Sequence, residues 1–265
     1  MGTWQGRLAL LAARAWILMG AAAWAGRPLS VDDADPVEPR RFELETGVGY
    51  ERTGSCRHWD LPFGLACGLV EGLEAGVGFG GQFERRERVL EECGIAETES
   101  AHGPADLALS VKWRFVTCER VGGRYALVPS VKLPTADGDE ELGSGETDGD
   151  LMWIGSWGLG ERAGLHCNLG YTWVGGPDAN LLHYGVALDF QVLDALQWVG
   201  EVLAERELQS TAQPVVQANT GVRWSLRENL VIDVAAGTRL SREAPRFTAT
   251  AGLTWSFGQT EGGGQ

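Results

Sequence analysis

The feature that most constrains this chain is an alternation of apolar and polar side chains that recurs along most of its length. In residues 104–116, apolar side chains occupy every second position over five repeats. These are Leu107, Leu109, Val111, Trp113 and Phe115, and the polar residues beside them are Asp106, Ser110, Lys112 and Arg114. Successive side chains of a β-strand point to opposite faces, so a period of two predicts strands.

About twelve segments of roughly ten residues carry this pattern, and no helical period interrupts them. They are residues 41–51, 61–70, 73–84, 104–116, 124–135, 150–160, 164–175, 181–193, 196–207, 214–226, 229–240 and 245–257. Segment 150–160 is the weakest, because Met152 and Ile154 fall on its polar parity. We also expect a bulge or distortion at Pro129, since proline cannot donate a hydrogen bond to a neighbouring strand.

The connections between these segments alternate between short and long. Short turns are expected at 70–72, 118–123, 161–163, 193–195 and 226–229, and mostly longer polar loops at 52–60, 85–103, 136–149, 176–180, 208–213 and 241–245. Short connections at one end and long ones at the other are typical of outer-membrane barrels, with short turns and both termini in the periplasm. This predicts an all-β fold, a transmembrane antiparallel up-and-down β-barrel of about twelve strands.

The alternative is a soluble barrel or sandwich whose apolar face points inward. Aromatic side chains favour the membrane, because the predicted strand directions gather them into two girdles at the ends of the barrel. The periplasmic girdle comprises Phe42, Trp113, Phe115, Tyr125, Trp157, Phe190, Trp198, Trp224, Trp255 and Phe257. The outer girdle comprises Tyr50, Phe63, Phe83, Trp153, Trp173 and Phe247.

The charged side chains lead to the same conclusion. The polar parity carries Glu43, Glu45, Glu74, Asp106, Lys112, Arg114, Lys132, Asp189, Glu201, Glu205, Arg223 and Asp233. A basic residue facing lipid near the midplane costs about 2–4 kcal/mol, so this face must line an aqueous lumen. The mixed signs of these charges argue against strong ion selectivity.

The N-terminus has the pattern of a secretory signal peptide. Arg7 and Arg14 accompany an apolar stretch that ends in Ala23-Trp24-Ala25, so residues 1–25 are expected to be removed on export to the outer membrane. An uncleaved N-terminal anchor is the alternative. The mature chain then divides into a polar periplasmic segment at 26–40, which is expected to plug the barrel, the barrel itself at 41–257, and a flexible tail at 258–265.

Enzyme and metal signatures are missing from the sequence. The four histidines and five cysteines are scattered singly, and no familiar catalytic motif occurs, so we expect no catalytic residues, no cofactor and no metal site. An outer-membrane hydrolase with a Ser–His pair stays an alternative. Cys56 and Cys93 fall in two irregular segments on one side of the barrel, and whether they form a disulfide or stay free is open. The acidic loop 137–150 reads as a solvated loop, with a calcium site as its alternative.

One cluster is a candidate functional site. Folding neighbouring strands back on their turns places His166 opposite Asp189, and Asp189 opposite Glu201, on the lumen side. Three titratable groups at one level form a candidate cation-binding or pH-sensing ring. The alternative is a hydrogen-bonded network that fills a narrow lumen, as expected for the pairs Glu74 with Arg114 and Arg223 with Asp233.

Several stretches resemble a known family. They are Arg27-Pro28-Leu29-Ser30-Val31-Asp32-Asp33-Ala34, Asp60-Leu61-Pro62-Phe63-Gly64-Leu65, Leu73-Glu74-Ala75-Gly76-Val77-Gly78, Val128 to Thr135 and Gly143 to Asp148. They resemble outer-membrane transporters labelled for the meta pathway of phenol degradation, over essentially the whole mature chain. The resemblance implies a barrel that passes aromatic or other hydrophobic small molecules, and it supplies no binding residues.

The sequence therefore predicts a passive outer-membrane pore or transporter for a small molecule. A non-conducting barrel that displays its loops is the alternative. Membrane lipid, lipopolysaccharide and the barrel-assembly machinery are the expected partners. The net charge of −14 argues against nucleic acid as a partner.

Overall fold

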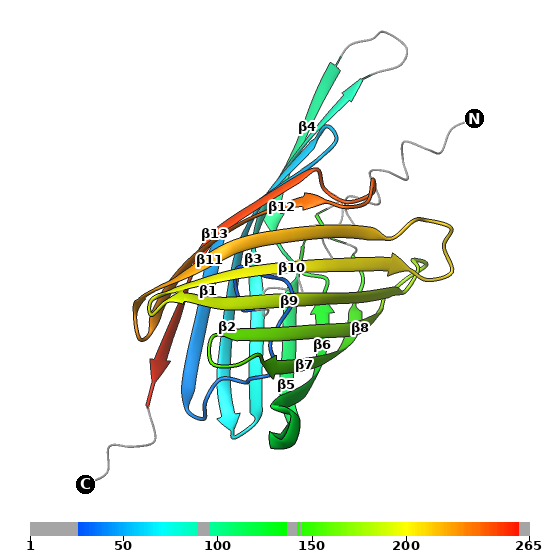
Figure 1. Cartoon of the computed structure of the whole chain (residues 1–265). Coiled ribbons are helices and arrows are strands. Elements are labelled where there is room, and N and C mark those ends of the chain that lie inside the picture. The colour runs from blue at the N-terminus through cyan, green and yellow to red at the C-terminus, as the bar shows by residue number, and fades with distance from the viewer. Residues whose placement is uncertain (1–25, 90–95, 137–141, 144, 260–265) are drawn as a thin grey trace.

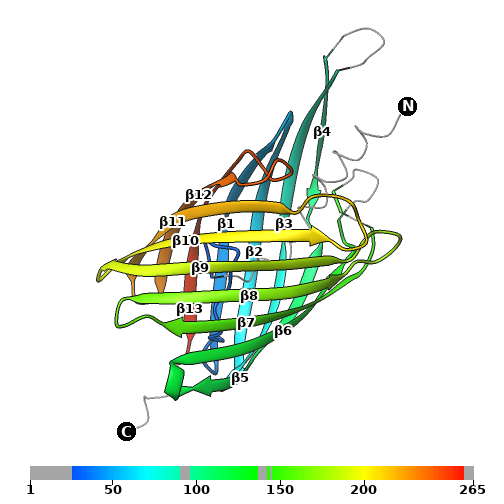
Figure 2. The same ribbon diagram turned by 45° about the vertical axis from the view of Figure 1, so that its right-hand side comes forward.

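The strands close into a ring in the computed structural model, which describes residues 26–89, 96–136, 142–143 and 145–259. β1 (Arg41–Thr53) pairs with β2 (Cys56–Val70) on one side and with β13 (Phe247–Gly258) on the other. All neighbouring pairs are antiparallel, and the pairing runs around the barrel until it returns to β1 (Figures 1 and 2). The predicted all-β barrel is confirmed, with twelve strands in the ring and one extra strand.

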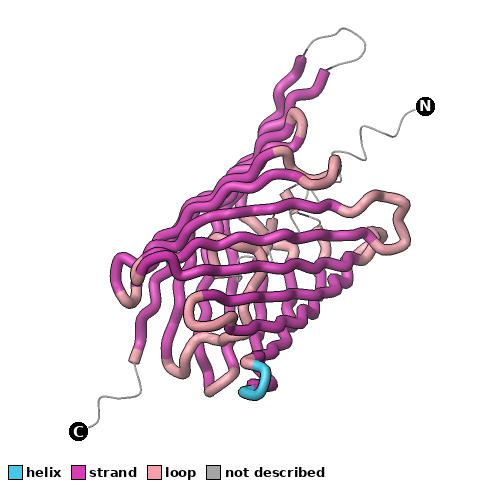
Figure 3. Tube along the Cα trace, in the orientation of Figure 1, coloured by secondary structure: helices cyan, strands magenta, loops and turns pink. Residues whose placement is uncertain are grey.

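The other strands follow in chain order around the ring, apart from β4. They are β3 (Leu73–Val89), β4 (Ala96–Pro104), β5 (Leu107–Cys118), β6 (Gly123–Leu133), β7 (Asp148–Gly158), β8 (Ala163–Trp173), β9 (Leu181–Leu193), β10 (Leu196–Glu207), β11 (Val215–Arg227) and β12 (Leu230–Arg239). A short 3-10 turn, Glu119–Val121, links β5 to β6, and Figure 3 shows how fully strands dominate the described chain. Within the described residues, no helix is long and apolar enough to cross a membrane.

Side chains on the ring are sorted by parity as the alternation predicts. On β5, Leu109 and Trp113 are 41% and 52% exposed on the outer wall, whereas Lys112 between them is 6% exposed inside the barrel. The same sorting recurs on β12, where Val234 is exposed and Asp233 is buried. Apolar surface therefore faces outward and charge faces inward, the reverse of a soluble barrel.

Two of the expected loops are strands instead. Residues 52–60 form only a tight turn at Gly54 before β2, whose alternation continues outward from the predicted start at residue 61. Residues 85–103 were also expected to be a loop, but β3 and β4 form a ribbon there that projects beyond the ring (Figure 1). The ribbon shows no apolar alternation because neither of its faces needs to meet lipid.

β3 changes partner along its length. Residues 73–78 pair with β5 as part of the ring. Residues 81–89 pair with β4 in the ribbon that projects beyond the ring. Within the described residues, β4 pairs only with β3, so it is an edge strand outside the closed ring.

The segment of residues 26–40, which precedes β1, lies inside the ring (Figure 2). Two small apolar clusters pack it against the wall. Leu29 and Val31 pack with Ala187 and Val199, while Ala34 packs with a group on β6 and β7. That group is Ala126, Val128, Ile154 and the partly buried Met152. The strand at 150–160 alternates poorly because its lumen side packs against Ala34 of residues 26–40 and does not face water.

Candidate functional site

The candidate site is the barrel lumen together with the segment 26–40 bound in it, which we call the plug segment. Residues from most of the ring contact it, and they include acids, bases and neutral hydrogen-bonding groups. The contacts involve Glu45, Glu74, Lys112, Arg114, Arg124, Ser156, Glu201, Arg223, Asp233 and Thr250. These ten side chains lie on nine different strands.

Arg27 anchors the beginning of the plug segment. Its guanidinium lies 3.3 Å from Asp233 on β12 and donates a 2.7 Å hydrogen bond to Thr250 on β13. Space for it depends on two glycines in the wall, because a Cβ on Gly47 or Gly252 would lie 2.4 Å from guanidinium atoms of Arg27. The two glycines and the two polar partners together form a fitted site for this one arginine.

Asp32 anchors the middle of the plug segment through Lys112 on β5. The Nζ atom of Lys112 lies 2.8 Å from Oδ2 of Asp32, and both side chains are almost completely buried. Burial raises the pKa of Asp32 to about 6, although the nearby positive charge of Lys112 lowers it. The side-chain amide of Asn168 on β8 lies beside the peptide group of Asp32 and can bond both its N–H and its carbonyl.

The plug segment also gives its peptide N–H groups to acceptors on the wall. Those of Ser30 and Val31 donate to the carboxylate of Glu201, at 2.9 and 2.7 Å. That of Val37 donates to Glu74 at 2.7 Å. These carboxylates satisfy buried donors that have no partner within the segment, so the wall determines the conformation of the plug segment.

Farther along the plug segment, Asp35 accepts hydrogen bonds from two arginines, Arg114 on β5 and Arg124 on β6, each at 2.8 Å. The last residues approach β2 closely. The N–H of Arg40 donates to the carbonyl of Gly68, and a Cβ at residue 68 would lie only 2.1 Å from the carbonyl oxygen of Glu38. Glycine is therefore the residue that this approach permits.

A chain of five polar side chains crosses the wall from β7 to β11, and we call it the lumen chain. It consists of Ser156, His166, Asp189, Gln197 and Arg223. Ser156 Oγ lies 2.9 Å from His166 Nδ1, His166 Nε2 lies 2.7 Å from Asp189, and Gln197 donates to Asp189 at 2.8 Å.

Both ends of the lumen chain touch the plug segment. At one end, Ser156 accepts a 2.9 Å hydrogen bond from the N–H of Ala34. At the other, Arg223 donates to Gln197 and to the carbonyl oxygens of Gly26 and Arg27. The chain therefore fixes two points of the plug segment that lie several residues apart.

The predicted cluster is formed only in part. His166 and Asp189 meet, but Glu201 lies opposite Ala187 and binds the plug segment and Asn219 instead. The expected pairing of Asp189 with Glu201 is wrong because a bulge at Leu196/Gln197 shifts the register of β9 on β10, so that Asp189 faces Val199. His166 and Asp189 meet diagonally, because the register of β8 on β9 sets Asp189 directly opposite Gly164.

Sequence reasoning missed Ser156, Asn168 and Gln197. All three lie on the lumen parity of their strands, which was the one available signal, but neutral polar residues do not stand out in a lumen rich in charge. A role of His166, Asp189 and Glu201 in cation binding or pH sensing stays a prediction.

The other predicted lumen charges all lie inside the ring, with different partners from those expected. Glu74 faces Lys112 in register, while Arg114 binds Asp35. Arg223 is opposite Asp233, as expected, but the side chain of Asp233 binds Arg27. The remaining residues are Glu43, which accepts from Ser256, Glu205, which is buried near the long-loop end, and Lys132, which lies between Asp106 and Asp148.

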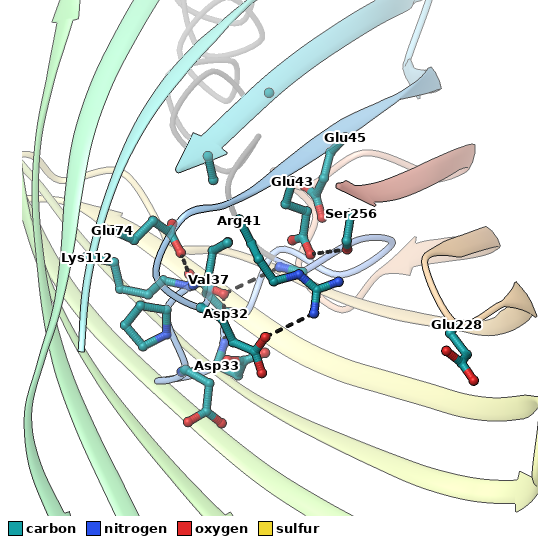
Figure 4. Close-up of a pocket in the computed structure, with 16 residues that line it drawn as sticks. Asp32, Asp33, Val37, Arg41, Glu43, Glu45, Glu74, Lys112, Glu228 and Ser256 are labelled. Carbon is teal, nitrogen blue, oxygen red and sulfur yellow. Dashed lines mark hydrogen bonds and ion pairs between the residues drawn. The ribbon is translucent and has the colours of Figure 1, made fainter. Parts of the chain in front are cut away.

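A cavity of about 350 Å³ lies beside the plug segment at the end of the barrel with the short turns (Figure 4). Its lining is strongly acidic, with two bases, Arg41 and Lys112. The carboxylates are Asp32, Asp33, Asp35, Glu38, Glu43, Glu45, Glu74 and Glu228. The lumen charges are mixed in sign, as expected, but acids predominate at this mouth because the plug segment adds four that strand parity alone does not count.

The residues predicted for the aromatic girdles lie on the outer wall. Trp113, Trp173, Trp224 and Trp255 are all exposed there, and Trp198 is too, with its indole N–H donating to Thr220. The others pack side by side on the same surface: Phe115 with Trp113, Tyr125 with Trp157, and Phe257 with Trp255.

Cysteines and metal ligands add nothing to the site. Cys56, Cys67, Cys118 and Cys167 are free thiols, and Cys93, the expected partner of Cys56, lies outside the described residues. So do the expected signal peptide at 1–25, residues 137–141 and 144 of the acidic loop, and all but two residues of the tail. Across the described ranges, no group of three His, Cys, Asp or Glu side chains is placed to hold a metal ion.

The fold is similar to that of several solved membrane barrels. An outer membrane channel from Pseudomonas putida F1 matches with a TM-score of 0.63 at 14% identity, over 85% of this chain and 98% of the channel. The NanC porin matches with a TM-score of 0.57 at 8% identity, over 80% of this chain and 98% of the porin. The translocator domain of the autotransporter NalP from Neisseria meningitidis matches with a TM-score of 0.53 at 13% identity, over 93% and 97%.

Among curated proteins, none matches this sequence. One family model matches residues 90–257, which is more than half of the chain and covers the ring from the end of β3 to β13. The barrel fold that the resemblance implies agrees with the fold of the channel and the porin above. The chain belongs to the family described as Uncharacterised conserved protein UCP029691.

Proposed function

We propose that this protein is a passive outer-membrane channel for small molecules, and that its plug segment closes the lumen until it is displaced. The observation that carries the proposal is the attachment of residues 26–40 to ten side chains on nine strands. Nearly all of these contacts are hydrogen bonds or ion pairs, and water can replace such contacts when the plug segment leaves.

The cavity supports a preference for the permeating solute. Eight carboxylates against two bases create a negative potential at this mouth, which attracts cations and repels anions. Neutral and cationic small molecules therefore fit the entrance better than anionic ones. Passage of hydrophobic or aromatic molecules, which the family resemblance implies, is compatible with this charge when those molecules are neutral.

Single-channel recording in planar bilayers tests the proposal. The wild-type protein is compared with a variant lacking residues 30–38, and a variant lacking the polar tail 259–265 serves as the control. We expect long closed periods in the wild type and in the control, and a steady, larger conductance in the plug deletion. Equal conductance of all three proteins would contradict a plug, and no conductance in any of them would favour a non-conducting barrel that displays its loops.

One observation favours a second function, that of a hydrolase. Ser156, His166 and Asp189 have the order of a nucleophile, a base and an orienting carboxylate, with hydrogen-bond distances of 2.9 and 2.7 Å. Yet Ser156 is completely buried beneath Ala34 and is not part of the cavity lining. A fluorophosphonate probe separates the two functions, because it would label Ser156 of a hydrolase, in the wild type or in the plug deletion, and would leave a channel unlabelled.

The cellular setting belongs to the same proposal. Export with removal of residues 1–25 and insertion by the barrel-assembly machinery would place the short turns and the cavity on the periplasmic side. Membrane lipid would then surround the apolar wall, with lipopolysaccharide at the long-loop end.

A further inference from the structure

On three neighbouring strands, the uncharged outward face ends in an arginine at the long-loop end. On β1, the outward side chains from Phe42 to Tyr50 are uncharged, and the next outward residue is Arg52. On β2, uncharged outward residues continue to Trp59, and Arg57 follows. On β3, they continue to Phe83, and Arg85 follows. Each strand thus changes from an apolar face to an arginine at its long-loop end.

Strand register places the three arginines side by side. Arg52 is directly opposite Arg57, and Arg57 is directly opposite Arg85. Directly opposite residues of an antiparallel pair have Cβ atoms roughly 4.5–5.5 Å apart, and like charges at that spacing destabilise the sheet. We call these three residues the arginine row.

The arginine row has too few carboxylates to neutralise it. Glu87, on β3, lies 3.7 Å from Arg57, and both side chains are more than 40% exposed. Within the described part of the chain, neither Arg52 nor Arg85 forms an ion pair. On the outward face of β4, the neighbours of Arg85 and Glu87 are the uncharged Ser100 and Thr98. The row therefore keeps an excess of positive charge in a protein whose net charge is −14.

An aromatic row lies directly below the arginine row and locates it relative to the membrane. Tyr50 is opposite Trp59, and Trp59 is opposite Phe83. The rings of Tyr50 and Trp59 are 4.6 Å apart, and Phe247 on β13 lies 6.2 Å from Tyr50. Aromatic residues gather where the hydrocarbon core ends. The arginines are two residues farther along each strand, about 7 Å, which is the level of lipid headgroups.

Tyr50 is eight residues from Phe42, which corresponds to about 26 Å along β1. A strand tilt of roughly 40° reduces this span to about 20 Å of height, and the two further residues to Arg52 bring it to about 25 Å, the height of the apolar band. The arginine row therefore lies at the outer edge of the lipid-facing band.

We propose that Arg52, Arg57 and Arg85 bind phosphate groups of the glycolipid in the outer leaflet, with the aromatic row packed against its acyl chains. A guanidinium binds phosphate through paired, charge-assisted hydrogen bonds, and three of them in a row match a headgroup that carries more than one phosphate. A phosphorylated lipid offers phosphate groups to the arginine row and acyl chains to the aromatic row, whereas free phosphate would bind only the arginines. The site lies on the outer wall and does not depend on whether the lumen conducts.

Native mass spectrometry of the full-length protein in detergent micelles tests this site, with lipid A carrying two phosphates as the probe. We expect the triple variant R52Q/R57Q/R85Q to bind it at least about tenfold more weakly than the wild type, since several charge-assisted contacts are lost. The matched control is Arg206→Gln, because Arg206 is an exposed arginine on the long-loop end of β10, opposite Leu182. This control should bind as the wild type does.

Two further binding measurements on the wild-type protein test the proposal without the triple variant. Dephosphorylated lipid A should bind the wild-type protein about tenfold more weakly, and millimolar inorganic phosphate should not displace lipid A. Heat-modified mobility in gels verifies that each variant is folded. Equal binding by the wild type and the folded triple variant, equal loss in R206Q, equal binding of both lipids, or displacement by inorganic phosphate would each overturn the proposal.

Discussion

At the scale of single residues, several charges of the lumen wall find partners of opposite charge on the plug segment. Arg27 has Asp233, Lys112 has Asp32, and Asp35 lies between two arginines. An ionised group without a partner in such a place would be strongly destabilising. The wall and the plug segment are therefore complementary in charge, and removing one member of a pair should weaken the attachment of the plug segment.

The substitution Asp233→Asn tests the pair at Arg27. Breaking a buried pair by removing one partner costs about 3–5 kcal/mol, and lumen water reduces this value here. We expect the open probability of the channel to rise by at least about tenfold. The control is Glu38→Gln, which removes an exposed pair with Arg41 of the kind worth about 0–1 kcal/mol. If both variants gated alike, Asp233 would not be an anchor.

Asp32 should make closure depend on pH. Its pKa is raised to about 6 in the bound plug segment, because burial and the nearby carboxylates of Asp33 and Glu74 outweigh the opposing effect of Lys112. In a released segment the pKa would return to its ordinary value of 3.8. The bound state then takes up a proton between these values, so binding of the plug segment strengthens as pH falls through about 6 and weakens as pH rises.

Recording at pH 7 and pH 5 measures this effect. We expect the open probability to fall roughly tenfold at pH 5, by the difference between the two pKa values. Asp32→Asn should reduce the change, and Asp33→Asn should retain it. A pH response in D32N as large as that of the wild type would assign it to other groups.

At the scale of elements, strand parity decides which side chains meet lipid. β7 shows how the plug segment modifies the rule, since Ile154 faces inward and is completely buried with Ala34 and Val128. Pro129 causes the expected distortion without a bulge. The register of β5 on β6 is the same on both sides of this proline, but the described pairing of the two strands is interrupted at Val128 and Pro129, and the register shift lies at Arg114/Val116.

Val111 provides a test of the lipid face. It lies on the outer wall near the middle of β5, so Val111→Arg should destabilise the barrel by about 2–4 kcal/mol. Guanidinium titration of protein folded in lipid vesicles measures the change. Val121→Arg is the control, because Val121 is exposed in the turn after β5 and should tolerate the charge. Equal stability of the two variants would mean that Val111 does not face lipid.

At the scale of the whole molecule, closure of the ring pairs both edges of its strands, and among the described strands β4 keeps an unpaired edge. The same closure creates one enclosed lumen, into which the plug segment brings four additional acids beside the cavity. The net charge of the mouth is therefore a property of the assembled molecule and not of any strand.

This charge predicts a preference for cations. The reversal potential across a potassium chloride gradient should show cations passing more readily than anions, and the double variant E43Q/E228Q should reduce the preference. Glu119→Gln, in the turn between β5 and β6 and outside the cavity lining, is the control. An anion preference in the wild type would contradict the assigned role of the cavity.

The sequence by itself determined the class of fold, the number of strands and the face of each strand that meets lipid. It could do so because a period of two directs each side chain either to lipid or to the aqueous lumen, and charged side chains are stable only in the lumen. It also brought His166 and Asp189 within reach of each other, because both share a parity on neighbouring strands.

Only the tertiary structure decided what the lumen contains. The place of Glu201 depended on a bulge, the ribbon of β3 and β4 lay where no alternation was required, and Ser156 and Gln197 carried no charge to mark them. The plug segment has no period at all, so its partners follow from a docking that involves strands across the whole barrel. These contacts between residues far apart in the sequence form only when the ring is closed, so no local sequence pattern predicts them.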